Sequence, residues 1–94
     1  MARVSVRITR LLADIAATDL TVRVEARTAG EALHALCVQV PALRVHVFDD
    51  AGEVRRHVNV FVAGEIVKGP GSLDVAVGDG DEVAVVQAVS GGES

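Results

Sequence analysis

Residues 20–41, which read LTVRVEARTAGEALHALCVQVP, change their hydrophobic period partway along. The first part alternates apolar and polar residues from Leu20 to Val24, which is typical of a strand with one buried face. Thr28 and Glu31 then form a Thr-x-x-Glu capping box, which makes Thr28 the predicted N-cap of a helix. The apolar residues that follow stand at helical spacing: Leu33, Leu36, Cys37 and Val40. Because the residue before a proline avoids the α region, Pro41 ends this helix, which we predict over residues 29–39.

Alternating segments lie on both sides of this stretch. Val4, Val6 and Ile8 predict a first strand, which pairs with residues 20–25 in an antiparallel hairpin. The connection, residues 10–19, is expected to contain one helical turn at residues 11–16. After the helix, residues 45–56 predict a short strand, a turn at residues 49–52 and a returning strand. Residues 58–62 give the clearest alternation in the second half and predict a further strand.

The last third of the chain supplies the end of the sheet. Gly64 marks a turn, and residues 66–67 predict a brief strand. Residues 68–78 are an expected loop from which Leu73 and Val75 fill the core, and a tight turn then leads into a last strand at residues 82–87. We therefore predict an α+β domain over residues 1–87, with one main helix across a mixed sheet of four to five strands, and a flexible tail at residues 88–94. The last strand is expected to lie beside the first.

Composition agrees with this fold class and excludes several functions. The 94 residues suit one domain, and the 19 valines and 14 alanines favour strands around a core of small side chains. The net charge of -4 and the aromatic content of 2% argue against nucleic acid as a partner. The single cysteine cannot form an internal disulfide, which favours a reducing cytoplasm. We find neither a signal-peptide pattern nor an apolar run long enough to span a membrane, so no membrane partner is expected.

Two segments carry a resemblance to a known family. Residues 55–65, RRHVNVFVAGE, and residues 79–92, DGDEVAVVQAVSGG, are similar to those of the ubiquitin-like sulfur carriers. That family includes the thiamin-pathway carrier, the small subunit of molybdopterin synthase and an actinobacterial carrier for cysteine biosynthesis, and residues 55–65 most resemble the last. The resemblance covers nearly the whole chain and implies a ubiquitin-like β-grasp fold.

The resemblance also implies a mechanism for the chain's end. Gly92 would carry sulfur, with Gly91 as its companion. An adenylating enzyme of the ubiquitin-activating type would use ATP to activate the Gly92 carboxylate, and sulfur would replace AMP to give a thiocarboxylate. A biosynthetic enzyme would then accept the sulfur. On this view the chain is a carrier and not an enzyme, and it binds no cofactor of its own.

The chain departs from the family pattern after the diglycine. Glu93 and Ser94 follow Gly92, so the Gly92 carboxyl group is held in a peptide bond. One explanation is that a metalloprotease of the JAMM type cleaves between Gly92 and Glu93, which leaves a functional chain of 92 residues. The other is that the extension is permanent and carrier chemistry is lost. A smaller departure is Gln87, where many relatives have proline, and it predicts a looser start to the tail.

Strand parity predicts a partner-binding surface. If the valines of residues 58–62 face the helix, Phe61 faces outward, and by the same parity so do Ala84, Val86 and Arg7. In ubiquitin-like proteins this face of the sheet commonly binds partners. The alternative is that Phe61 is only an isolated exposed hydrophobic residue, covered in part by arginine side chains.

The histidines and the cysteine give little indication of a functional site. His34, His46 and His57 are too widely spaced for a metal site, so none is expected, and Cys37 lies on the apolar stripe of the helix as a core residue. Two rival functions stay open. A ubiquitin-like modifier would join its activated glycine to lysines of other proteins, and a structural β-grasp domain would have an inert tail.

Overall fold

The computed structural model describes residues 1–67 and 71–87 of the chain. The predicted tail, with Gly91, Gly92 and Glu93, lies outside the described residues. The elements, in chain order, are β1 (Ala2–Ile8), α1 (Arg10–Ala16), β2 (Thr21–Ala26), α2 (Ala29–Gln39), the 3₁₀ turn η1 (Pro41–Leu43), α3 (Arg44–Val47), β3 (Val58–Val62), β4 (Glu65–Val67), the 3₁₀ turn η2 (Ser72–Asp74) and β5 (Glu82–Gln87).

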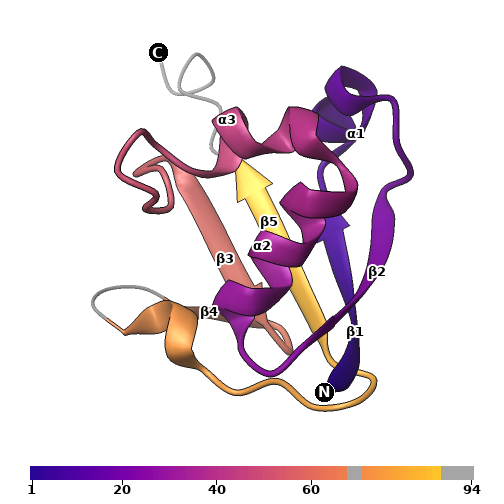
Figure 1. Ribbon diagram of the computed structural model, residues 1–94, viewed down its shortest axis with the longest axis vertical. Helices are drawn as coiled ribbons and strands as arrows, with labels where there is room; N and C mark the ends of the chain where they lie inside the picture. The colour runs from indigo at the N-terminus through magenta and orange to yellow at the C-terminus, as the bar shows by residue number, and fades with distance from the viewer. Residues whose placement is uncertain (68–70, 88–94) are drawn as a thin grey trace.

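The strands form one five-stranded mixed sheet in the order β2-β1-β5-β3-β4. β1 and β5 are parallel neighbours at its centre, and every other adjacent pair is antiparallel. α2 crosses one face of this sheet (Figure 1). The predicted first hairpin and the return of the last strand beside the first are both confirmed. This is the β-grasp arrangement that the resemblance implies.

The core lies between α2 and the sheet and is made almost wholly of aliphatic side chains. Val4, Val6, Val83 and Val85 of the two central strands are at most 2% exposed, and Leu33 and Leu36 of α2 are fully buried against them. The described residues bury no complete polar or charged side chain. Strands that alternate so strictly can bury only one face, so the opposite face of the sheet is left to solvent or to a partner.

α2 begins and ends where the sequence predicts. Thr28 Oγ1 accepts a hydrogen bond from the Glu31 N–H at 3.1 Å, and the Glu31 carboxylate accepts from the Arg27 N–H at 2.8 Å. The reciprocal bond therefore falls one residue before the N-cap. Residues 75–77 run alongside this end of the helix, because the Val75 carbonyl accepts from the Ala29 N–H and the Val77 N–H donates to the Arg27 carbonyl, both at 2.9 Å.

Two predictions about the fold are wrong. Residues 44–47 form α3 instead of a strand, because Leu43 and Val47, four residues apart, are both fully buried on one side of a helical segment. Of the predicted returning strand, a single bridge remains between Phe48 and Val54 around the correctly predicted turn. In the loop before β5, Leu73 does pack against the core, but Val75 is 37% exposed, and Val77, at 8%, is buried in its place.

Candidate functional site

Gln87, the last residue of β5, is the last described residue before the predicted sulfur-carrying terminus in the sequence. It pairs with Val58, the first residue of β3. The Gln87 Oε1 atom is buried, and no donor among residues 1–67 and 71–87 lies within hydrogen-bond distance of it. A buried acceptor that stays unpartnered costs about 1–3 kcal/mol of stability.

The predicted partner-binding residues come together on the sheet face that α2 does not cover. Arg7 pairs with Ala84, Ala84 with Phe61, and Phe61 with Ile66, so these four residues form one row across four strands. Val86 lies on the same face two residues further along β5, opposite Asn59. We call these five residues the outer sheet patch: Arg7, Phe61, Ile66, Ala84 and Val86.

The outer sheet patch is accessible but not fully exposed. Ile66 is 46% exposed and Val86 is 39% exposed, whereas Phe61 and Ala84 are half-buried among their neighbours. Ile66 was missed from the sequence. The signal for it was the two-residue turn at Ala63 and Gly64, both with positive φ, because such a hairpin places Ile66 opposite Phe61.

Charge divides this face into two halves. β1 and β2 contribute arginines and one glutamate to it, while β5, β3 and β4 contribute the apolar residues of the patch, with Glu82 at the start of β5. Arg7 stands at the boundary, where its guanidinium lies 3.9 Å from the Glu82 carboxylate. Both side chains are largely exposed, so this ion pair adds little stability and leaves Arg7 available to a partner.

His34 and Cys37, to which the sequence analysis assigns no functional role, both pack against other side chains. His34 is exposed and stacks on Phe48, with ring centroids 4.7 Å apart. Burial raises the pKa of the Cys37 thiol, an effect that the nearby Arg44 only partly offsets, so this cysteine is a poor nucleophile. Within residues 1–67 and 71–87, no group of His, Cys, Asp and Glu side chains is placed to hold a metal ion.

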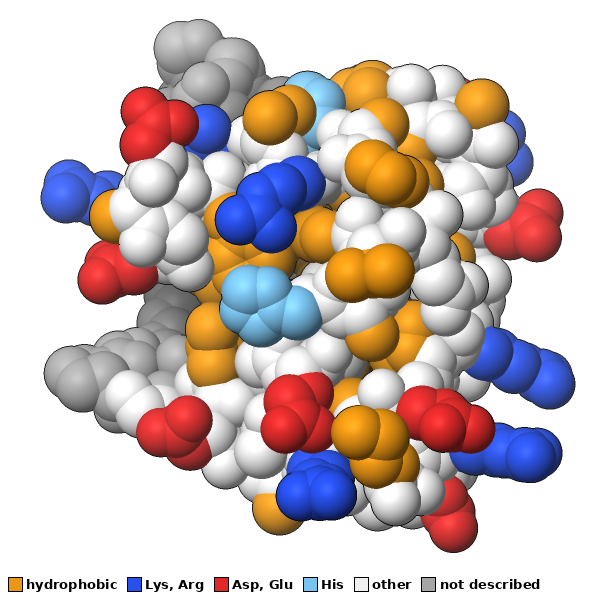
Figure 2. All heavy atoms as spheres, viewed as in Figure 1, with side chains coloured by type: hydrophobic (Ala, Val, Ile, Leu, Met, Phe, Trp, Pro, Cys, Tyr) orange, Lys and Arg blue, Asp and Glu red, His pale blue; other side chains and the backbone are white. Residues whose placement is uncertain are grey.

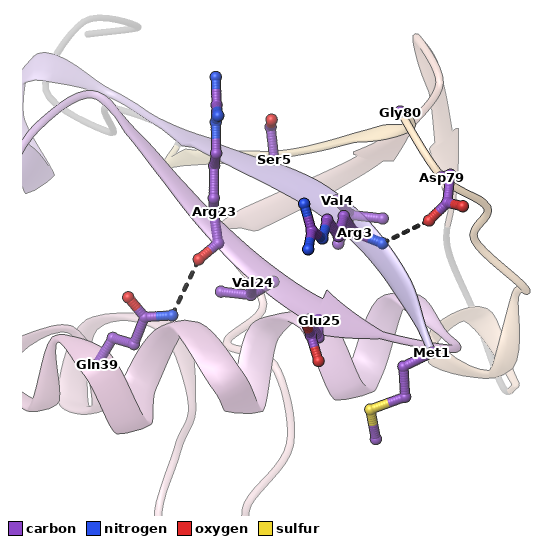
Figure 3. Close-up of a pocket in the computed structure, with 10 residues that line it drawn as sticks. All are labelled: Met1, Arg3, Val4, Ser5, Arg23, Val24, Glu25, Gln39, Asp79 and Gly80. Carbon is purple, nitrogen blue, oxygen red and sulfur yellow. Dashed lines mark hydrogen bonds between the residues drawn. The ribbon is translucent and has the colours of Figure 1, made fainter.

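One hollow lies at the β2 edge of the sheet, and Figure 3 shows the residues that line it. Gln39 reaches across from α2, and its Nε2 donates to the Arg23 carbonyl at 2.9 Å. On the other side the Arg3 N–H donates to Asp79 Oδ1 at 2.8 Å. The lining also includes Ser5 and Glu25.

The helical side of the molecule also exposes hydrophobic side chains: Val38 of α2 is 79% exposed and Val45 of α3 is 63% exposed. Charged groups of both signs are mixed along the margins of this side (Figure 2). Among the described helices, none is long and apolar enough to cross a membrane.

Comparisons with known proteins identify the family. The sequence model of the ThiS family matches residues 6–92. The chain is 43% identical over 88 residues to small archaeal modifier protein 1 of Haloferax volcanii, which covers 88% of this chain and 97% of that protein. The crystal structure of that protein superposes with a TM-score of 0.83, at 37% identity over 95% of this chain and 98% of the other.

A second relative is a sulfur carrier. CysO of Mycobacterium tuberculosis is 44% identical over 41 residues, which make up 44% of each chain. Its crystal structure superposes with a TM-score of 0.79, at 28% identity over 92% of this chain and 99% of the other. With the mixed sheet and single crossing helix, these matches show that the chain belongs to the ThiS family of ubiquitin-like β-grasp proteins.

Proposed function

We propose that this chain is a cytoplasmic sulfur carrier whose working group is the carboxylate of Gly92. The observation that supports this most is the extent of the family match, which reaches Gly92 and leaves Glu93 and Ser94 outside it. The described domain agrees with such a role, since it buries its apolar side chains in a compact core and offers an open sheet face to a partner. The group that reacts would be the end of the chain and not a pocket.

The proposed chemistry has two steps, both on an activating enzyme. A Gly92 carboxylate oxygen attacks the α-phosphorus of ATP, pyrophosphate leaves, and an acyl-adenylate forms. Sulfide then attacks the acyl carbon, AMP leaves, and the thiocarboxylate remains. The carrier itself supplies the carboxylate, the reach of the tail and the docking surface, and ATP is bound by the activating partner.

Cleavage of the bond between Gly92 and Glu93 comes first in this proposal. Only hydrolysis of that bond frees the carboxylate that attacks ATP. A metalloprotease of the JAMM type is the proposed agent. Gly91 and Gly92 would fit the active sites of both the protease and the activating enzyme, because two residues without side chains can pass through a narrow channel.

The outer sheet patch is the surface that we propose for docking the activating enzyme. Phe61, Ile66 and Val86 offer apolar area next to the arginines of β1 and β2. A complementary partner would therefore present an apolar surface flanked by carboxylates. Arg7, at the boundary, would meet the first of these carboxylates.

A second candidate function is protein modification through the same glycine. It is favoured by the 43% identity to a relative that is named a modifier and that the match covers almost completely. The activated Gly92 would then be transferred to a lysine amine of a target protein. Both functions begin with adenylation, so they part only at the second step.

The experiment compares chains that end at Gly92 and at Ser94, each incubated with ATP and the activating enzyme of the source organism. The proposal expects pyrophosphate release with the Gly92 chain alone, and with sulfide a product heavier by the difference between sulfur and oxygen. Modification would instead leave residues 69–92 as a branch on target lysines after trypsin, because Lys68 is the last tryptic site before Gly92. A tail that supports neither reaction would show an inert β-grasp domain, and an equally reactive Ser94 chain would exclude the need for cleavage.

A further inference from the structure

The parallel pairing of β1 and β5 sets the two ends of the domain far apart. Ser5 lies opposite Glu82, and both strands run in the same direction from that point. Figure 1 shows the first residue at one end of the sheet and the tip of β5 at the other. Met1 lies four residues before Ser5 and Gln87 lies five residues after Glu82, so about 30 Å separates them along the strands.

The carrying segment is too short to span that separation. Five residues follow Gln87 up to Gly92, and a fully extended chain of that length covers roughly 17 Å. In the protein expressed from Met1, the α-amine therefore lies well beyond the reach of an activated Gly92 carbonyl. Amines are the groups that such a carbonyl acylates most readily under mild conditions, so their positions decide where it reacts.

The side chains within reach have no free amine either. All positively charged side chains of the described residues are arginines: Arg3, Arg7, Arg10, Arg23, Arg27, Arg44, Arg55 and Arg56. A guanidinium stays protonated and has no lone pair for attack on a carbonyl, unlike the ε-amine of lysine. The one thiol, that of Cys37 on the buried side of α2, is 6% exposed. The chain's single lysine, Lys68, lies outside the described residues.

We infer that the described domain, residues 1–67 and 71–87, offers no amine that its own activated terminus can acylate. The competing reaction would be attack of an amine of the same chain on the Gly92 carbonyl, with loss of AMP and formation of an internal amide. Geometry excludes this reaction for the α-amine, and the use of arginine excludes it for the charged side chains near the end of β5. This inference rests on the proposed activation of Gly92, because only an activated terminus could be lost to attack by an amine of the same chain.

The test adds an amine at a near and at a distant position. Arg56 is exposed and lies two residues before Val58, the partner of Gln87, so it is within reach of the tail. Arg27, also exposed, follows Ala26, which pairs with Ala2 at the far end of the sheet. Arg56→Lys and Arg27→Lys are each made in a Lys68→Arg background, so that each variant contains one lysine.

The terminus is activated without any enzyme, as a Gly92 thioester released from an intein fusion. The lysine amine attacks the thioester carbonyl, the thiol leaves, and an internal amide forms, which intact mass and tryptic mapping detect. We expect at least about tenfold more internal amide in Arg56→Lys than in Arg27→Lys, because a tethered group has a millimolar effective concentration only at positions that its tether can reach. The Lys68→Arg parent is expected to lose its thioester to hydrolysis alone.

Two results would overturn the inference. One is an internal amide at Met1 or at any described residue in the Lys68→Arg parent, and the other is equal cyclisation of the two lysine variants. Because the thioester is made chemically, these results do not depend on the activating enzyme. Failure of enzymatic adenylation would count against the proposed function and would leave this result unaffected.

Discussion

The two glutamines of the described domain should respond in opposite ways to the same substitution. No donor of the described residues reaches the buried Gln87 Oε1 atom, whereas Gln39 Nε2 donates to the Arg23 carbonyl at 2.9 Å. Methionine has nearly the length and shape of glutamine but no strong polar group. Gln87→Met should therefore remove the cost of a buried unpartnered acceptor, and Gln39→Met should remove a hydrogen bond.

The magnitudes follow from these contacts. An unmet buried acceptor costs about 1–3 kcal/mol, so Gln87→Met is expected to raise the free energy of unfolding by about 1 kcal/mol or more. A net hydrogen bond is worth about 0.5–1.5 kcal/mol, and the exposed bond of Gln39 should lie near the lower end. In a domain of this size 1 kcal/mol moves Tm by roughly 4–8 °C, so the two variants should melt on opposite sides of the parent.

Urea and thermal unfolding followed by far-ultraviolet circular dichroism would measure both variants, since the chain has no Trp or Tyr to serve as a fluorescent probe. Equal m-values would show that the comparison concerns the folded state. A Gln87→Met variant that is less stable than the parent, or unchanged, would refute the reasoning. It would mean that Oε1 is satisfied in solution, for example by a bound water.

Three further substitutions or reactions test other parts of the structure. Phe61→Asp, at the centre of the outer sheet patch, should weaken binding to the activating enzyme about tenfold or more in a titration, while the circular dichroism spectrum stays unchanged. Unchanged affinity would show that the patch does not bind this enzyme. Gly30→Ala should lower Tm although alanine normally favours helices, because the new Cβ would lie 3.0 Å from Leu73 Cβ and 3.1 Å from the Leu73 carbonyl oxygen. A raised Tm would show that Leu73 moves away at little cost. Cys37 should react with iodoacetamide at pH 8 far more slowly in the folded protein than in urea, because burial raises its thiol pKa and hides it; equal rates would contradict its place in the core.

Periodicity predicted the elements that pack in long, regular runs. The valines of β1, β3 and β5 and the capping box of α2 lie where their spacing indicates, because their local preferences and their burial agree. Residues 44–47 could not be predicted in this way. Val45 and Val47 alternate like a strand, and only the burial of Leu43 and Val47 against the rest of the core shows the segment to be helical.

The site was partly predictable for the same reason. Parity placed Arg7, Phe61 and Ala84 on one face, and the register of β5 between β1 and β3 sets them in one row. The unmet acceptor of Gln87 had no sequence signal, since the sequence suggested only a looser exit from β5 at this position.

The most direct test of the central claim is the intact mass of the protein isolated from its own cell. The proposal predicts a chain that ends at Gly92, part of which is heavier by the difference between sulfur and oxygen, with the change mapped to the C-terminal peptide. A chain found only with Glu93 and Ser94 still attached, and with no sulfur at its end under conditions of high sulfur demand, would contradict it.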